Sequence, residues 1–311
     1  MIHPKYEKWP YKKVLPEHVP ILIERYQLGE SVEKISTDFP FGKDAILKVL
    51  RDFDIPIKTR KENRFSMGFS INENAFLDQE EPECAYFYGW LLTDGCLRET
   101  KYAHTVTIQI QKGDISVLHS LEAYLGLSGR VKTRDRFDKR TGNTYSSCNM
   151  QFQYAPITDR LMDFGLEPRK SLNEVCPKEF LLNRDFWRGV LEGDGHLPKL
   201  GGYNKIQICG SEELCRQWAD YCKSIIPEIK VTVYPATKKS GKNLFYAYCG
   251  KFEECKKILD SLYLGVPENL RLERKYNLYV GRYYNGLDPN RAGEFADRQH
   301  PSKSPISDLY G

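Results

Sequence analysis

The feature that most constrains this chain is a short motif that occurs twice, one hundred residues apart. Residues 87–95 read FYGWLLTDG, and residues 187–195 read WRGVLEGDG. In each copy a glycine stands five residues before an aspartate, and the copy ends on Asp-Gly. The repeat therefore predicts two equivalent helices, each ending on a carboxylate: Asp94 in the first copy and Asp194 in the second.

Each predicted helix also carries small residues four positions apart, at 89 and 93 and at 189 and 193. Small residues at this spacing let two helix backbones approach closely. We expect the two helices to pack side by side as a seam, with Asp94 and Asp194 adjacent. For either copy alone, the Asp-Gly pair could simply end a helix in a turn. Its occurrence in both copies, in register with the repeat, favours the paired arrangement.

The residues that follow each motif repeat one order of elements. Their periodicity predicts a strand, a helix, a pair of strands and a closing helix. These elements span 104–111, 114–126, 129–137, 144–154 and 156–166 in the first half, and 204–210, 211–226, 229–237, 243–250 and 252–265 in the second. The sequence therefore predicts an α+β fold with an internal repeat of about a hundred residues.

Residues 1–57 are expected to form a small all-α domain, with three short helices between residues 17 and 53. Two short helices joined by a tight turn are typical of a helix-turn-helix, whose second helix enters the DNA major groove. The exposed cations of this candidate recognition helix are Lys43, Lys48 and Arg51. The alternative is a helical bundle that serves only as a brace.

Residues 58–83 show no sustained periodicity and are predicted to be a linker. The basic start of this segment is expected to lie along DNA, or alternatively to be a solvated connection; its cations are Lys58, Arg60, Lys61 and Arg64. The two halves of the repeat are assigned to 84–182 and 183–285. The polar, turn-rich residues 286–311 are assigned to a flexible tail.

The predicted strands gather polar side chains on one face, because side chains alternate between the two faces of a strand. The candidate DNA contacts on these strands are Arg130, Lys132, Arg134, Arg136, Asn149, Gln151, Gln153, Lys205, Lys230 and Lys238. Guanidinium and amide groups pair with guanine and adenine edges, and lysines neutralise phosphates. Although the net charge is only +4, this pattern favours double-stranded DNA as the partner over an ordinary solvated sheet face.

The two aspartates also suggest a metal. Carboxylates held together at the negative ends of two helix dipoles repel one another. A hard divalent cation bound through oxygen neutralises such a pair, and between basic surfaces it is suited to hydrolysis of a phosphodiester. We therefore expect Asp94 and Asp194 to bind Mg²⁺, or another divalent cation such as Mn²⁺.

The two motifs and the surrounding strand pattern resemble the LAGLIDADG homing endonucleases in their single-chain, two-motif form, over roughly residues 84–280. The resemblance implies two pseudo-symmetric αββαββα halves that form a DNA-binding saddle, with Asp94 and Asp194 as metal-binding catalytic acids. It also implies a catalytic lysine in each half, Lys170 and Lys275, which stabilises phosphorane-like charge or tunes a water, and suggests that two glutamines, Gln109 and Gln207, order the attacking waters.

The first motif departs from the family pattern, because Leu92 stands where an acid is common and Thr93 where a small residue is common. This departure puts equal activity of the two sites in doubt. The N-terminal domain resembles accessory helix-turn-helix modules that accompany the nucleases of mobile elements.

The sequence accordingly predicts a free-standing, site-specific DNA endonuclease that acts as a monomer and makes a metal-dependent double-strand break in a long asymmetric target. The alternatives are a non-cleaving transcriptional regulator on the same scaffold and an RNA maturase. A regulator has no need of both acids, whereas this chain has both. Only the preference for DNA or RNA would reveal a maturase.

Other classes of protein are disfavoured. No run of about 18 apolar residues suggests a membrane span, and no apolar segment follows the charged N-terminus as in a signal peptide. A cytoplasmic location follows as the expectation. The nine cysteines include no Cys-x-x-Cys pair, and the six histidines are scattered. Neither a structural zinc site nor nucleophilic catalysis is therefore expected.

Overall fold

The computed structural model describes residues 14–57, 71–100, 103–199, 202–236 and 244–287. The chain divides into two compact units, Met1–Ile71 and Asn72–Gly311. None of the helices in the described ranges is both long and apolar enough to cross a membrane. Several predicted features lie outside the described residues: Lys58, Arg60, Lys61, Arg64, Lys238 and the tail beyond residue 287.

The first unit contains three short helices, α1 (His18–Gln27), α2 (Val32–Thr37) and α3 (Lys43–Asp52). The Ser31 side chain accepts a hydrogen bond from the backbone N–H of Lys34 and so caps α2. The apolar faces of the helices meet in one small core, which includes Val19, Leu22, Tyr26, Ile35, Ile46, Val49 and Leu50. Three helices are therefore present where the sequence predicts them, and their use as a helix-turn-helix stays a prediction.

The second unit begins earlier than the predicted boundary at residue 84. Ala75 and Phe76, within the predicted linker, are buried. Phe76 packs edge-on against Tyr124 with ring centroids 5.2 Å apart, and its backbone N–H bonds the Tyr124 hydroxyl at 2.8 Å. Two apolar side chains in a polar stretch are enough to fix this segment to the unit that follows.

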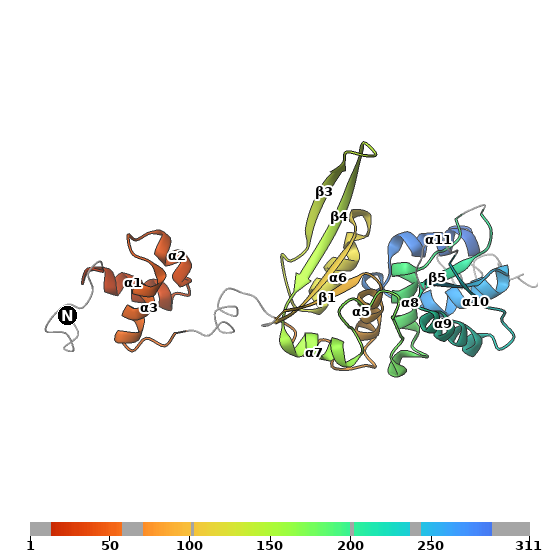
Figure 1. The fold of residues 1–311 in the computed structure, drawn as a ribbon, viewed down its shortest axis with the longest axis horizontal. Helices are drawn as coiled ribbons and strands as arrows, with labels where there is room; N and C mark the ends of the chain where they lie inside the picture. The colour runs from red at the N-terminus through yellow and green to blue at the C-terminus, as the bar shows by residue number, and fades with distance from the viewer. Residues whose placement is uncertain (1–13, 58–70, 101–102, 200–201, 237–243, 288–311) are drawn as a thin grey trace, which may run out of the picture. The chain divides into compact units, whose positions relative to one another are not determined.

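The first half of this unit follows the order αββαββα (Figure 1). Its elements are α5 (Pro82–Thr93), β1 (Gly95–Thr100), β2 (Ala103–Gln111), the 3₁₀ turn η1 (Lys112–Asp114), α6 (Ile115–Tyr124), β3 (Lys132–Asp138), β4 (Asn143–Phe152) and α7 (Ala155–Asp163). The strands form an antiparallel sheet in the order β1-β2-β4-β3. Its inner face carries buried apolar side chains, including Val106, Ile108, Cys148 and Met150, and α6 and α7 pack against the sheet.

The second half contains η2 (Lys178–Phe180), α8 (Arg184–Asp194), β5 (Ile206–Gly210), α9 (Glu212–Ile225), β6 (Thr232–Pro235), β7 (Phe245–Cys249), α10 (Phe252–Tyr263), η4 (Glu268–Leu270) and α11 (Glu273–Tyr283). Its sheet has the order β5-β7-β6. Where the αββαββα order expects a strand after α8, the described residues show only one bridge, between His196 and Gln207. Pro198, which cannot donate to a strand ladder, follows His196 closely and disfavours a strand there.

The two motif helices, α5 and α8, lie side by side at the centre of the second unit (Figure 1). Their glycines meet: a Cβ added to Gly189 would lie 2.3 Å from the Tyr86 carbonyl oxygen, and one added to Gly89 would lie 2.5 Å from that of Phe186. Any larger residue would push the backbones apart. The predicted seam is therefore confirmed.

Candidate functional site

The seam brings the two motif aspartates to adjoining helix ends. Asp94 is the C-cap of α5, and Asp194 is the last residue of α8. Gly193, the residue before Asp194, faces the end of α5: an added Cβ there would lie 2.9 Å from Asp94 Oδ2 and 2.1 Å from Thr93 Oγ1. The absence of a side chain at position 193 thus lets the Asp94 carboxylate approach the end of α8.

The electrostatics of the pair favour a neutralising group. Burial, and secondarily the charge of Asp194, raise the pKa of Asp94 to about 6. Burial also raises the pKa of Asp194, although this side chain still reaches solvent. Because the charged forms are disfavoured, a cation at the two carboxylates would be held strongly.

The described residues contain no group of three or more His, Cys, Asp or Glu side chains arranged to hold a metal ion. Two carboxylates are nevertheless a fitting donor set for Mg²⁺. This ion usually keeps several waters and binds through one or two carboxylates together with phosphate oxygens. Asp94 and Asp194 are the residues that would hold it.

Lys275 of α11 lies beneath the end of α8 and is 4% exposed. Its Nζ donates to the carbonyl oxygens of Leu191, Glu192 and Gly195 at 2.6–2.7 Å. Burial lowers the pKa of Lys275 to about 8. Its ammonium group therefore satisfies the last carbonyls of α8 and offsets the negative end of the helix dipole.

Lys170 occupies the corresponding place in the first half. Its Nζ donates to the Thr93 carbonyl at the end of α5, at 3.0 Å, and burial lowers its pKa. The nearby charges that act on Lys170 include those of Asp194 and Asp94. Both predicted lysines thus lie near the acid pair, and both bond to backbone carbonyls of the helices that carry it.

The two predicted glutamines are not equivalent. In the first half, Cys96 pairs with Thr107, whereas in the second half its counterpart His196 pairs with Gln207. Gln109 therefore lies two residues further along its strand than Gln207. The Tyr234 hydroxyl bonds Gln207 Oε1 at 3.4 Å, whereas Gln109 is exposed. The repeated Ile-Gln-Ile triplet is out of register with the motifs by two positions.

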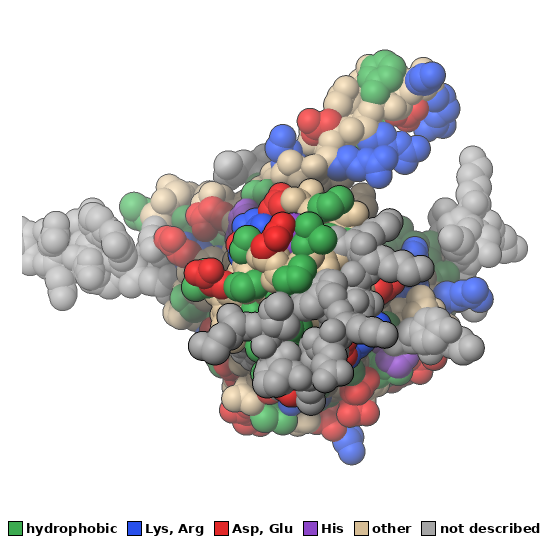
Figure 2. Space-filling model, turned by 90° about the vertical axis from the view of Figure 1, so that its left-hand side faces the viewer, with side chains coloured by type: hydrophobic (Ala, Val, Ile, Leu, Met, Phe, Trp, Pro, Cys, Tyr) green, Lys and Arg blue, Asp and Glu red, His purple; other side chains and the backbone are tan. Residues whose placement is uncertain are grey.

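The first sheet gathers five of the predicted DNA contacts on its outer face. Lys132 pairs with Asn149, which pairs with Gln109, and Thr107 pairs with Gln151. Cross-strand partners share a face, and alternation adds Arg134 and Arg136 to it. The β3–β4 hairpin extends well beyond the helices (Figure 1), and Figure 2 shows Lys and Arg side chains gathered along this projection.

Two residues predicted for this face lie just outside its strands. Gln153 is exposed directly after β4. Arg130 precedes β3, and its backbone N–H is held by Glu122 Oε1. Both therefore flank the face.

The predicted cations of the second sheet are fewer and differently placed. Lys205 directly precedes β5, and its Nζ lies 4.8 Å from the centre of the Tyr248 ring. Lys230 is exposed, two residues before β6 begins. Three tyrosines, Tyr234, Tyr246 and Tyr248, share the outer face of this sheet, where the sequence predicts lysines as the DNA contacts.

In the first unit, the side chains of Lys48 and Arg51 are exposed on α3. Lys43 Nζ forms an ion pair with Glu33 Oε1 of α2 at 3.0 Å, and both side chains are exposed. Exposed ion pairs of this kind contribute little to stability. Lys43 can therefore leave Glu33 and bind a phosphate at little cost.

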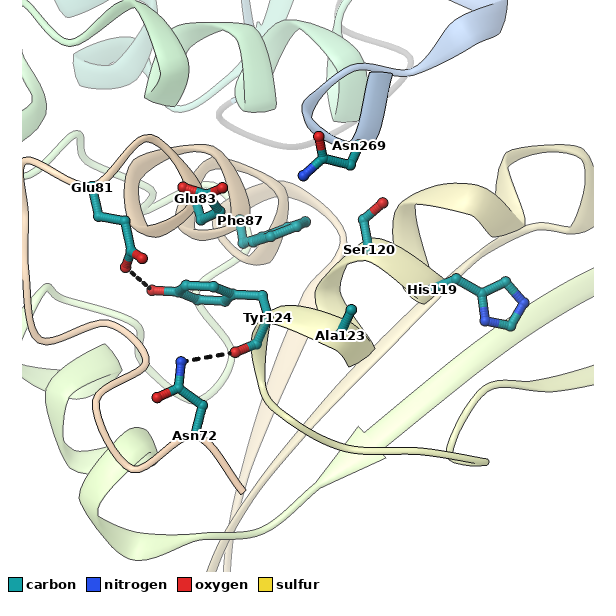
Figure 3. A pocket seen from close by; sticks show the side chains of 9 residues that line it. All are labelled: Asn72, Glu81, Glu83, Phe87, His119, Ser120, Ala123, Tyr124 and Asn269. Atoms are coloured by element: carbon teal, nitrogen blue, oxygen red, sulfur yellow. Dashed lines mark hydrogen bonds between the residues drawn. The ribbon is translucent and has the colours of Figure 1, made fainter. Parts of the chain in front are cut away.

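A cavity of about 520 Å³ lies away from the acid pair, near the N-terminal end of α5 (Figure 3). Glu81, Glu83 and Phe87 line it, together with Tyr124 of α6 and Asn269 of η4. At about 1.5 Å of rise per residue, the length of α5 separates this cavity from Asp94. The cavity is therefore not part of the candidate site.

The structure also shows a buried network that sequence reasoning missed. The Tyr86 hydroxyl of α5 donates to Glu192 Oε2 at 2.6 Å, and the backbone N–H of Leu272 donates to the same oxygen at 2.9 Å. Arg188, fully buried, bonds the carbonyls of Leu262 and Leu270. The only signal in the sequence is that two charged residues, Arg188 and Glu192, flank the apolar Val190 and Leu191 within the second motif. These bonds fix α8 against α5 and the segment that leads to Lys275.

Comparisons with known proteins give distant similarities only. No protein-family model matches this chain, and no curated protein matches it. Among solved structures, the homing endonuclease I-WcaI bound to its DNA recognition sequence is similar over 74% of this chain and 92% of that chain, with 13% identity and a TM-score of 0.42. The N-terminal LAGLIDADG domain of DUF199/WhiA is similar over 68% and 89%, with 14% identity and a TM-score of 0.39. The function of this chain is therefore inferred from its own side chains.

Proposed function

We propose that this chain is a site-specific DNA endonuclease of the LAGLIDADG type, which makes a metal-dependent double-strand break in a long asymmetric target. The observation that carries this proposal is the placement of Asp94 and Asp194 at the adjoining ends of α5 and α8, close enough for the charge of Asp194 to raise the pKa of Asp94. Two helices that serve only to pack would not need an acid at each end.

Asp94 and Asp194 would hold Mg²⁺ or Mn²⁺, which when bound polarises a phosphoryl oxygen and activates water. Lys275 and Lys170 have a positioning role, because they bond the carbonyls that end α8 and α5. These lysines keep the two aspartates at fixed helix ends while their own charges lower the cost of holding two carboxylates together.

The DNA would lie across the outer faces of the two sheets. On the first sheet, Lys132, Arg134 and Arg136 are exposed and in line, as contacts with the phosphate backbone and guanine edges require. The first unit would add a second contact through α3. Because the outer faces of the two sheets differ in sequence, the target need not be a palindrome.

A non-cleaving DNA-binding regulator is the second candidate, and a specific observation favours it. Lys275 gives its hydrogen bonds to backbone carbonyls at the end of α8, so its burial there is explained without catalysis. The described residues also provide no third acidic ligand beside the aspartates. Under this alternative both lysines are parts of the scaffold.

The experiment that separates the two functions is cleavage of a randomised duplex library in the presence of Mg²⁺. The wild-type chain is compared with the double variant Asp94→Asn/Asp194→Asn and with an EDTA control. Double-strand breaks at a recurring site, absent from the variant and in EDTA, are the expected result. Enrichment of a bound site that is never cut, and that the double variant binds equally well, would make the chain a regulator.

A further inference from the structure

The outer face of the second sheet is aromatic. Register and alternation place Tyr246 opposite Cys209 and Tyr234, and Tyr248 opposite Gln207 and Thr232. Tyr234 stands between the other two tyrosines, with ring centroids 5.5 Å from Tyr246 and 5.7 Å from Tyr248. All three side chains are half-exposed, on the face opposite the buried Ala247 and Cys249.

This aromatic face continues to the acid pair. The Cys209 thiol on the same face bonds the Asp194 carbonyl oxygen at 3.3 Å, and Gln207 pairs with His196, two residues after Asp194. The corresponding face of the first sheet carries Arg134 and Arg136 instead. The two faces that flank the acids therefore differ in chemistry as well as in sequence.

Because the two faces differ in chemistry, they would contact different groups on the edges of DNA bases. In the major groove, Arg and Lys bond the acceptors of guanine, and Asn and Gln bond adenine, whereas thymine alone presents a methyl group to apolar contacts. Tyrosine rings held edge to face offer a rigid apolar surface with a polar rim. Lys205, whose Nζ lies 4.8 Å from the Tyr248 ring and 3.5 Å from the Tyr234 hydroxyl, adds a cation for phosphate.

We propose that the tyrosine face, formed by Tyr234, Tyr246 and Tyr248, reads thymine methyl groups in the major groove of one half of the target, while the first sheet reads purines in the other half. The proposal rests on the proposed function only for its DNA partner and does not require cleavage. It gives the asymmetric target a predicted composition: one half carries thymines at the contacted positions, and the other half carries guanine and adenine.

The test uses the full chain and a duplex enriched from a random library by binding, not by cutting. Thymine is replaced by deoxyuridine, which lacks only the methyl group, in one half of the site at a time. The expected result is a loss of affinity of about fourfold per contacted methyl in one half, with no change in the other. Equal insensitivity of both halves overturns the proposal.

Variants assign the methyl effect to the tyrosines. Tyr246→Ser and Tyr248→Ser should each reduce the difference between thymine and deoxyuridine, whereas Tyr246→Phe and Tyr248→Phe, which keep the ring, should preserve it. Phe137→Ser on β3, where Phe137 is 60% exposed and lies on the face opposite Arg136, is the aromatic control and should leave the difference unchanged. A methyl effect that survives both serine variants overturns the assignment.

Single-stranded DNA of the same sequence gives a further arm, because tyrosines can also stack on unpaired bases. Tighter binding to the single strand than to the duplex overturns the proposal in favour of base stacking. A methyl-sensitive duplex that is never cut supports the tyrosine face and contradicts the endonuclease. Cleavage of a duplex without methyl sensitivity does the reverse.

Discussion

At the scale of single residues, the decisive feature is a pair of carboxylates in a place where their charges are costly. Burial and the neighbouring Asp194 raise the pKa of Asp94 from 3.8 to about 6. Between these two values the folded state binds a proton that the unfolded state does not. Without metal, the free energy of unfolding must therefore fall as the pH rises through this window. The loss of stability caused by ionising Asp94 in the folded state is complete above pH 6.

Replacement of Asp94 by Asn should therefore stabilise the metal-free chain at pH 8, by about 1–2 kcal/mol after allowance for screening on its solvent-facing side. At pH 4 the gain should vanish, because the wild-type carboxyl is protonated there in the folded state. Urea unfolding in EDTA at both pH values measures the difference. Asp163→Asn, at the exposed end of α7, is the control and should show no such gain. An equal gain at both pH values would contradict the account.

The two lysines differ in the number of backbone carbonyls that they bond. Lys275 bonds several carbonyls at the end of α8, whereas Lys170 bonds the Thr93 carbonyl. A buried acceptor that loses its hydrogen-bond donor destabilises the folded state. Lys275→Met should therefore lower the free energy of unfolding by at least about 2 kcal/mol, and Lys170→Met by about 1 kcal/mol. Parallel urea titrations test the order, and an equal or reversed effect would show that the backbone bonds do not set it.

At the scale of elements, the seam of α5 and α8 positions the site. Gly189→Ala would place a Cβ 2.3 Å from the Tyr86 carbonyl oxygen, so the helices must separate. We expect a loss of stability of about 3 kcal/mol or more, as for overpacked cores. Gly113→Ala is the matched control, because nothing lies within 4 Å of the added Cβ. Thermal unfolding compares the two, and a tolerated Gly189→Ala would contradict the close approach.

The β3–β4 hairpin makes a separate prediction about binding. All residues of β3 from Lys132 to Phe137 are exposed, so their cations can reach phosphates. Arg134→Gln and Arg136→Gln should each weaken DNA binding and reduce the slope of log K against log salt by about 1. Lys223→Gln, on α9 and away from the outer faces, should leave the slope unchanged. Fluorescence anisotropy over a range of salt concentrations measures it.

At the scale of the whole molecule, local repeats could be predicted from the sequence and long-range register could not. The seam follows from small residues four positions apart, and the polar outer face of the first sheet follows from alternation. The offset between Gln109 and Gln207 depends on which residues pair across strands, and no local pattern shows it. The bonds of Lys275 likewise join residues eighty or more positions apart.

The second half shows the same limit. Its periodicity predicts the strands that the structure shows as β5, β6 and β7, yet tyrosines take the place of the expected basic residues on the outer face of their sheet. The side chain that suits a strand position depends on its cross-strand neighbours, and the sequence alone does not show which residues those are. Under the proposed function, this difference between the two faces would let the chain read an asymmetric target.

The central claim is that Asp94 and Asp194, at the ends of the two seam helices, are required for cleavage of DNA. The most direct measurement is strand-resolved cleavage of an enriched target in Mg²⁺ by the wild-type chain and by Asp94→Asn/Asp194→Asn, with binding measured in parallel. We predict that the wild-type chain cuts both strands, and that the double variant binds the target but cuts neither. A double variant that cuts like the wild type, or a wild-type chain that binds without cutting, would contradict the claim.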